Sequence, residues 1–180
     1  HRVPAEAMTD RGRFPGWLRA LVGLWTISTG ALADSAPPQQ LDAWEGCLLT
    51  SDGPVPVVLE HASTREQHRW GLMERDSLPE NAGMLFFYQS ERSATAGFWM
   101  YRTRIPLDIA WLDENGTILA MDTMTPCDTE QARDCPSWAP GVPHRNVLEM
   151  NAGFFQKHHV ETGDKLVADL NDNKPCPVAD

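Results

Sequence analysis

Between residues 55 and 170, the apolar residues are grouped into short runs that are interrupted by glycine, proline and other turn-forming residues. Several runs are rich in β-branched and aromatic residues, which favour strands. About seven such runs and two brief helical segments are present. This pattern predicts a mainly β fold, a compact antiparallel sandwich or barrel.

The clearest local signal is a β-hairpin. Residues 107–113 and 117–124 are expected to be its strands, joined by a turn in which Asn115-Gly116 supplies the positive φ angles that tight hairpins need. Further strands are expected at 55–61, 84–88, 97–101, 146–150 and 165–170. Ser63 and Glu66 have the spacing of a capping box and predict a helix to about Met73, and a helical turn is expected at 154–158.

The first 33 residues differ in composition from the rest. Arg11, Arg13 and Arg19 precede an uncharged stretch at 20–33, which ends in Ala31-Leu32-Ala33. This arrangement is typical of a secretory signal peptide, and residues before Met8 are expected to be an extension. The stretch is too short to cross a bilayer core of about 30 Å as a helix, so no membrane span is expected in the mature chain. A helix of the mature fold is the alternative interpretation.

All four cysteines follow this segment, an even number that suits disulfides in an oxidising compartment. Of three possible pairings, the sequence favours Cys127 with Cys135, which flank a polar loop, and Cys47 with Cys176. A zinc site at Cys127, Cys135 and His144 is the alternative, although no C-x-x-C pair is present. We therefore expect a periplasmic or secreted protein.

The remaining chain is long enough for one domain. We expect a leader and first edge segment at 34–54, a single β-domain at 55–170, and a C-terminal tail at 171–180 that Cys176 ties down. Lysine and arginine number 15 against 25 aspartates and glutamates, which gives a formal net charge of −10. This acidity argues against a nucleic-acid partner.

The sequence contains no G-x-S-x-G, H-E-x-x-H, G-x-G-x-x-G or P-loop motif, so an enzyme would have to use carboxylates, histidines or a metal. Asp108 and Glu149 lie within apolar strand runs. Each is either an ordinary solvent-facing residue or a residue whose carboxyl group points into a polar cavity and has a raised pKa. On one wall, the two carboxylates would suit glycosidase-type acid and base catalysis.

Two further side chains are candidates for ligand binding. Arg75 suits a bidentate clamp on a carboxylate, or else a contact that pins a loop. Trp99 lies in a strand with large apolar groups on both faces, where it either packs in a second core layer or stacks on a sugar in a cleft. Six methionines after residue 70 are scattered over separate strands, which favours core packing over a copper site. No metal or cofactor is expected.

Several motifs together resemble the DUF192 family of small bacterial and archaeal domains, over about residues 55–170. They are Trp70-Gly-Leu-Met73, Gly83-Met-Leu-Phe86, Phe98-Trp-Met100, Ile105-Pro-Leu-Asp-Ile109 and Val147-Leu-Glu149. The resemblance implies a small β-sandwich of jelly-roll-like character and no known activity. The polar positions that recur in the family correspond here to Arg75, Asp108, Glu149 and Asn151.

The leading functional hypothesis is therefore a non-catalytic extracytoplasmic domain that binds a small polar ligand or an envelope component. Its candidate ligand-binding residues are Arg75, Trp99, Asp108, Glu149 and Asn151. One alternative is a hydrolase of envelope sugars that uses Asp108 and Glu149. Another is a structural or assembly partner of an envelope protein.

Overall fold

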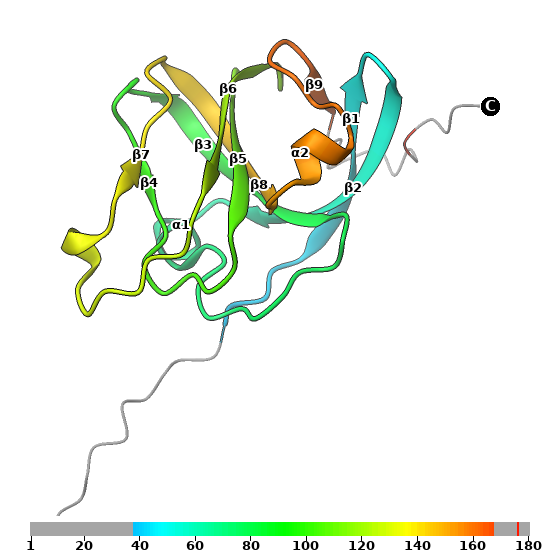
Figure 1. Ribbon diagram of the computed structural model, residues 1–180. Coiled ribbons are helices and arrows are strands. Elements are labelled where there is room, and N and C mark those ends of the chain that lie inside the picture. The colour runs from blue at the N-terminus through cyan, green and yellow to red at the C-terminus, as the bar shows by residue number, and fades with distance from the viewer. Residues whose placement is uncertain (1–37, 168–175, 177–180) are drawn as a thin grey trace, which may run out of the picture. The chain divides into compact units, whose positions relative to one another are not determined.

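Strands are the main secondary-structure elements of the fold (Figure 1). The computed structural model describes residues 38–167 and Cys176. The strands are β1 (Ala43–Thr50), β2 (Gly53–Ala62), β3 (Ala82–Arg92), β4 (Phe98–Trp99), β5 (Leu107–Leu112), β6 (Ile118–Met124), β7 (Ser137–Trp138), β8 (His144–Asn151) and β9 (Lys165–Val167). Two α-helices, α1 (Arg65–Trp70) and α2 (Phe154–Lys157), and one 3₁₀ turn, η1 (Ala132–Asp134), complete the elements. The mainly β prediction is confirmed.

Seven of these strands form one sheet in the order β6-β5-β8-β3-β2-β1-β9, and β4 pairs with β7 separately. Neighbouring strands are antiparallel, with the exception of β2 and β3. A parallel pair needs a crossover connection, and the segment 63–81, which contains α1, provides it. The sequence prediction of an antiparallel sheet therefore holds for all but this pair.

The sheet curls, so that its two outer strands meet at one end (Figure 1). The N–H of Ile118 donates to the carbonyl of Asp164 at 2.8 Å, and the N–H of Leu166 donates to the carbonyl of Gly116 at 2.9 Å. These bonds satisfy backbone groups that an open sheet would leave unpaired at its edges. The result is a half-barrel that is closed at this end.

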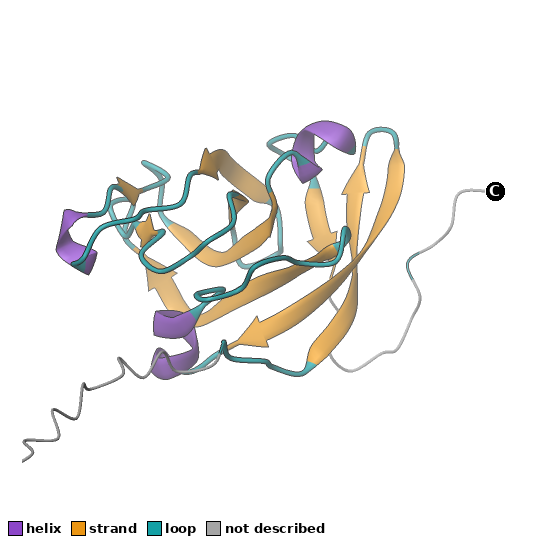
Figure 2. Cartoon of the chain, turned by 60° about the horizontal axis from the view of Figure 1, so that its bottom comes forward, coloured by secondary structure: helices purple, strands orange, loops and turns teal. Residues whose placement is uncertain are grey.

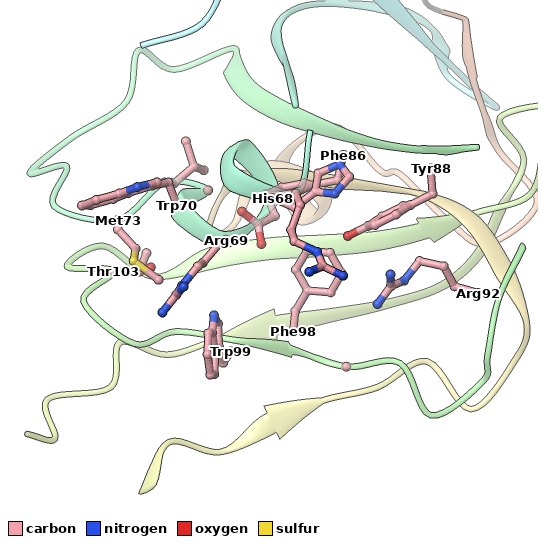
Figure 3. Close-up of a pocket in the computed structure, with 15 residues that line it drawn as sticks. His68, Arg69, Trp70, Met73, Phe86, Tyr88, Arg92, Phe98, Trp99 and Thr103 are labelled. Atoms are coloured by element: carbon pink, nitrogen blue, oxygen red, sulfur yellow. The ribbon is translucent and has the colours of Figure 1, made fainter. Parts of the chain in front are cut away.

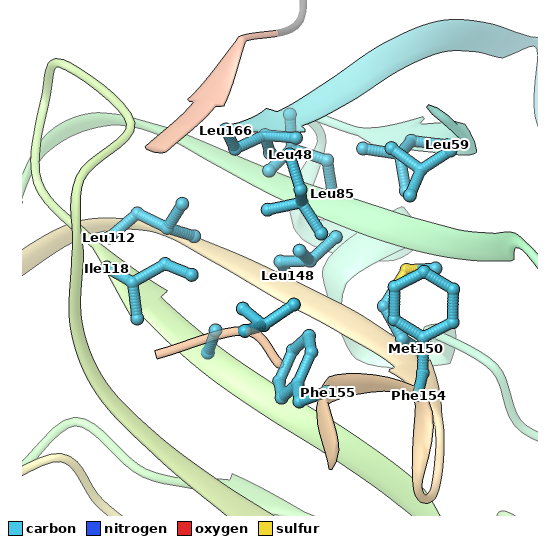
Figure 4. Packing of buried hydrophobic residues seen from close by; sticks show 13 residues of the cluster. Leu48, Leu59, Leu85, Leu112, Ile118, Leu148, Met150, Phe154, Phe155 and Leu166 are labelled. Carbon is cyan, nitrogen blue, oxygen red and sulfur yellow. The ribbon is translucent and has the colours of Figure 1, made fainter. Parts of the chain in front are cut away.

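Apolar residues are buried on both faces of the sheet, because side chains alternate along each strand. Leu85 and Leu148 point into the concave face, where α2 adds Phe154 and Phe155 (Figure 4). Met84, Phe86, Ile109, Trp111 and Val147 form a second cluster on the other face, against which Phe98 of β4 and Trp138 of β7 pack. Figure 2 shows α1 and α2 well apart, each beside a different part of the sheet.

Helix α1 begins one residue later than the sequence predicts. Thr64 is its N-cap: its hydroxyl accepts the N–H of Gln67 at 3.2 Å, and the Gln67 side chain accepts the N–H of Thr64 at 3.0 Å. The capping box is therefore Thr64 and Gln67, instead of Ser63 and Glu66. The helix ends at Trp70, before Met73, because Gly71 leaves the helical conformation with a φ of 47°.

The predicted hairpin is formed by β5 and β6, which pair from Leu107 and Met124 onward. Its turn differs in one detail, since Gly116, with a φ of 82°, has the positive φ angle and Asn115 does not. Asp113 instead holds the turn, because its carboxylate accepts the N–H groups of Asn115 and Thr117 at 2.8 Å each. A Cβ on residue 116 would lie 2.2 Å from the carbonyl oxygen of Leu166, so glycine is required.

The segment expected as a leader and first edge contributes an inner strand. β1 pairs with β2 on one side and with β9 on the other, so β9 is the edge strand. The predicted signal peptide lies outside the described residues. Among the described residues, no helix is both long and apolar enough to span a membrane.

Two disulfides join Cys47 to Cys176 and Cys127 to Cys135, the pairing that the sequence favours. The first links β1 to a residue near the C-terminus, 129 positions away, and the second closes an eight-residue separation before β7. Because the sulfurs of Cys127 and Cys135 are bonded to each other, they do not form the alternative zinc site with His144.

Candidate functional site

A pocket of about 610 Å³ opens beside α1 (Figure 3). We call it the arginine pocket. Its lining residue Phe86 belongs to the apolar cluster on the face of the sheet opposite α2. The pocket's charged and polar lining comprises Arg65, His68, Arg69, Arg92, Thr103 and Glu149, and its aromatic lining comprises Trp70, Phe86, Tyr88, Phe98 and Trp99. A volume of this size suits a small organic ligand.

Helix α1 supplies Trp70 and, because of its sequence spacing, three of the charged and polar side chains. Arg65, His68 and Arg69 lie at positions i, i+3 and i+4, which place them on one side of a helix. Strand β3 supplies Arg92, whose guanidinium lies 4.2 Å from the centre of the Tyr88 ring. Two elements that are distant in sequence therefore converge on the pocket with positive charge.

The three pocket arginines lack acidic partners within residues 38–167. The arginine salt bridges found there belong to Arg75, Arg102, Arg104 and Arg133. The Nε of Arg92 is buried and has no hydrogen-bond partner in the described part of the chain. Guanidinium groups bind carboxylates and phosphates with paired hydrogen bonds, so Arg65, Arg69 and Arg92 are free to bind an anion.

Among the described residues, Glu149 of β8 is the one that brings a carboxyl group to the lining of the arginine pocket, and it is only 4% exposed. No hydrogen bond reaches this carboxyl group from the described residues. Burial raises the pKa of Glu149 to about 8, because desolvation penalises the charged form. At neutral pH the group is mostly protonated, so it adds little negative charge and can donate a hydrogen bond to a ligand.

His68 is uncharged at neutral pH for a related reason. Burial lowers its pKa, and its Nε2 donates to the carbonyl of Ala62 at 3.0 Å. Its ring packs 4.3 Å from that of Tyr88. Since Glu149 and His68 are both largely neutral, the charge of the pocket at neutral pH comes from its arginines.

Of the side chains predicted from the sequence, Trp99 and Glu149 meet in the arginine pocket. Trp99 belongs to β4 and is 43% exposed, so part of its ring is open to solvent. The other three predicted ligand-binding residues do not line this pocket, and each makes contacts within the fold.

Asp108 lies on the concave face of the sheet, where it is 3% exposed. One carboxylate oxygen accepts the N–H of Phe155 at 2.9 Å, and the other accepts the hydroxyl of Thr123 at 2.8 Å. Asp108 thereby satisfies a free N–H in the first turn of α2, which has no side-chain cap at Gly153. Its contacts are those of a residue that anchors α2 to the sheet.

Asp108 and Glu149 are not brought together. Within the pair β5 and β8, Asp108 lies opposite Met150 and Ile109 lies opposite Glu149. Because adjacent residues in a strand point to opposite faces, the two carboxyl groups lie on opposite sides of the sheet. This arrangement does not supply the shared wall that the hydrolase hypothesis requires.

Arg75 and Asn151 each hold a connecting segment. Arg75 forms a bidentate ion pair with Glu60 at 2.5 and 2.8 Å and donates to the carbonyl of Gln39 at 2.5 Å. The amide of Asn151 donates to the carbonyl of Pro79 at 2.8 Å. These contacts fix the segment before β1 and the loop before β3.

Sequence reasoning missed Arg65, His68, Arg69 and Arg92. The i, i+3, i+4 spacing of the first three is visible in the sequence and marks one face of a helix. It does not reveal what the face lies against. The contribution of Arg92 depends on the path of β3, which only the tertiary structure shows.

Comparison with known proteins adds a family and a fold. The DUF192 family model, described as "Uncharacterized ACR", matches residues 47–168. No curated protein matches the sequence.

Two solved structures are similar to the chain. One is a protein from Sinorhizobium meliloti 1021 that is described as a proposed transcription regulator, with 28% identity and a TM-score of 0.65 over 73% of this chain and 98% of that one. The other is a protein of unknown function from Novosphingobium aromaticivorans, with 26% identity and a TM-score of 0.63 over 73% of this chain and 89% of that one.

Proposed function

This chain belongs to the DUF192 family, and we propose that it binds a small organic anion in the arginine pocket without transforming it. The observation that carries the proposal is the convergence of Arg65, Arg69 and Arg92 on one pocket, none of them with an acidic partner among the described residues. The same pocket contains the buried carboxyl group of Glu149, which accepts no hydrogen bond from those residues. In a protein of net charge −10, such a group of arginines is not explained by general basicity.

The lining defines the chemistry of the ligand. Its acidic group, a carboxylate, phosphate or sulfate, is bound by the arginines, and its body contacts the aromatic walls. A hydroxyl or amide at its other end pairs with Glu149, whose protonated carboxyl group both donates and accepts. Binding is favoured over catalysis because Asp108, the second carboxylate of the hydrolase hypothesis, contacts Phe155 and Thr123 on the other face.

We further propose that the protein works outside the cytoplasm, as a periplasmic or secreted domain. Its two disulfides support this, because such bonds form and persist in oxidising compartments. An envelope component is then a natural source of the ligand.

A role on DNA is not proposed, although the Sinorhizobium protein is described as a proposed transcription regulator. A protein that binds the phosphate backbone needs an extended positive surface. The net charge of this chain is −10, and the free arginines described above are gathered in one pocket of small-molecule size.

The proposal is tested by titration calorimetry at pH 7 with benzoate, phenyl phosphate and inorganic phosphate. We expect phenyl phosphate to bind more tightly than inorganic phosphate, because the aromatic walls contact its ring. Arg69→Gln should weaken phenyl phosphate binding by about tenfold, the effect of losing a hydrogen bond to a charged group.

Lys165→Gln is the matched control, since it removes the same charge from β9, which does not line the pocket. Its affinity for phenyl phosphate should equal that of the unmodified protein. An equal loss in both variants would reveal a general charge effect instead of a site, and the absence of binding by all three anions would overturn the proposal.

A further inference from the structure

A second hollow adjoins the arginine pocket and shares part of its lining. We call it the outer hollow; its volume is about 580 Å³. The two share Arg65, Arg69, Trp70, Met73 and Trp99 as lining residues. Since one set of side chains lines both, the two hollows lie next to each other, and a ligand of more than one unit can contact both.

The outer hollow has its own aromatic and charged side chains. Tyr101 and Arg102 line this hollow alone, and the Tyr101 ring lies 6.4 Å from that of Trp99. Arg102 lies 5.5 Å from the centre of the Trp70 ring and is paired with Glu74 at 2.5 Å. Aromatic surfaces and guanidinium groups thus continue from one hollow to the next.

Arg102, which lines the outer hollow, has an unusual backbone conformation, as does its partner Glu74. Glu74 and Arg102 both have positive φ angles, 64° and 56°, and the N–H of Glu74 donates to the carbonyl of Arg102 at 2.8 Å. Residues other than glycine adopt this conformation at an energetic cost and often do so at ligand sites. The pair fixes Arg102 beside Trp70, where a ligand would meet it.

We propose that the ligand is an acidic oligosaccharide, with one acidic sugar in the arginine pocket and the next sugar against Trp99 and Tyr101 in the outer hollow. This inference rests on the proposed function and extends it to a substrate class. The C–H groups of a pyranose ring carry a small positive charge and pack on the negative face of an aromatic ring, while its carboxylate pairs with arginine.

The geometry favours a sugar over a flat aromatic ligand. The Trp99 and Tyr101 rings are tilted by 55° to each other, so they do not form the parallel plates that would clamp a nucleobase. A puckered sugar ring presents C–H groups in several directions and fits tilted faces. Glu66 also lines the outer hollow, and its carboxylate can accept hydrogen bonds from sugar hydroxyls that a simple polyanion lacks.

The experiment measures the affinity of the intact, oxidised protein for galacturonic acid and for its linear dimer and trimer, with tri-glutamate and maltotriose as comparison probes. We expect the uronic acid trimer to bind about tenfold more tightly than the monomer, because only the longer ligand reaches the outer hollow. Maltotriose, which lacks carboxylates, and tri-glutamate, which lacks sugar rings, should show no comparable gain.

Two variants test whether the higher affinity of the trimer arises in the outer hollow. Tyr101→Leu removes a stacking surface, and Ala132→Trp fills the outer hollow from η1; neither residue lines the arginine pocket. Each should reduce trimer affinity to that of the monomer and leave monomer affinity unchanged. Trp44→Leu is the matched control, because Trp44 is an exposed tryptophan of β1 that lines neither hollow.

The outcomes separate the two proposals. The glycan inference is overturned if galacturonic acid binds but its trimer binds no more tightly than the monomer. It is also overturned if tri-glutamate alone binds more tightly than galacturonic acid. In both cases the anion-binding proposal stands. If neither galacturonic acid nor the aromatic anions bind, both proposals fail. A length-dependent gain that Tyr101→Leu and Ala132→Trp abolish supports the glycan inference.

Discussion

Glu149 shows how the environment of one residue changes its chemistry. The unfolded chain leaves this carboxyl group in water, whereas the folded chain buries it, which raises its pKa from an ordinary value of 4.5 to about 8. Between these values the unfolded state loses the proton before the folded state does. The free energy of unfolding therefore falls as the pH rises from about 4.5 to about 8, by at most about 1.4 kcal/mol per pH unit.

This linkage gives a prediction for Glu149→Gln. The uncharged amide removes the pH-dependent loss, so the variant should match the unmodified protein near pH 4 and be more stable than it by several kcal/mol near pH 8. Urea unfolding at both pH values measures the difference. The same change at exposed Glu114 should have no such effect, and parallel pH profiles for the protein and the Glu149 variant would refute the assignment.

At the scale of the elements, Asp108 links β5 to α2. Helix α2 has four residues and no side-chain cap of its own, so it depends on this carboxylate for a partner to the N–H of Phe155. We expect Asp108→Ala to lower the free energy of unfolding by about 2–3 kcal/mol, because it leaves a buried N–H and the Thr123 hydroxyl without an acceptor.

Affinity for phenyl phosphate distinguishes this role from ligand binding. It should not change in Asp108→Ala at temperatures where the variant is folded, since Asp108 does not line the arginine pocket. Thr123→Val, which removes one of the two hydrogen bonds, should cost about 1 kcal/mol. Loss of binding without loss of stability in Asp108→Ala would restore Asp108 as a ligand-binding residue.

For the molecule as a whole, the two disulfides have different expected effects. Cys47–Cys176 spans 129 positions and Cys127–Cys135 spans eight, so loop-closure entropy predicts stabilisation of about 5 and about 2.5 kcal/mol, respectively. The second, however, closes the loop that leads into β7, which pairs with Trp99 and Phe98 of β4 in the pocket wall.

We therefore expect opposite rankings in two measurements. Replacing Cys47 and Cys176 by serine should lower the denaturant midpoint more, whereas replacing Cys127 and Cys135 should weaken phenyl phosphate binding more. Both double variants are compared with the oxidised protein below their melting temperatures. If the Cys127 and Cys135 pair proves neutral for binding, the loop does not support the pocket wall.

Much of the fold follows from local sequence. The hairpin of β5 and β6 was predictable because Asn115-Gly116 separates two apolar runs, and the mainly β class followed from many short runs of this kind. The segment that contains β1 was expected at the edge of the sheet, but β1 is an inner strand, because it also pairs with β9, which lies far away in sequence. The parallel pairing of β2 with β3 was missed because it depends on where the crossover containing α1 places β3.

The candidate site was predictable only in part. The sequence singled out Glu149 because a carboxylate is unusual within an apolar strand run, and Trp99 because large apolar groups lie on both faces of its strand. Which face each side chain takes is decided by strand register, so Asp108 and Glu149 looked equivalent in sequence yet lie on opposite sides of the sheet.

Alone, the amino-acid sequence determined the strand-rich character, the hairpin and the acidic charge, because these depend on residues close to one another or on composition. Only the tertiary structure decided that Arg65, Arg69 and Arg92 converge with Glu149, because α1, β3 and β8 meet through a crossover and long-range pairing. Burial then set the protonation of Glu149, a property that no local pattern specifies.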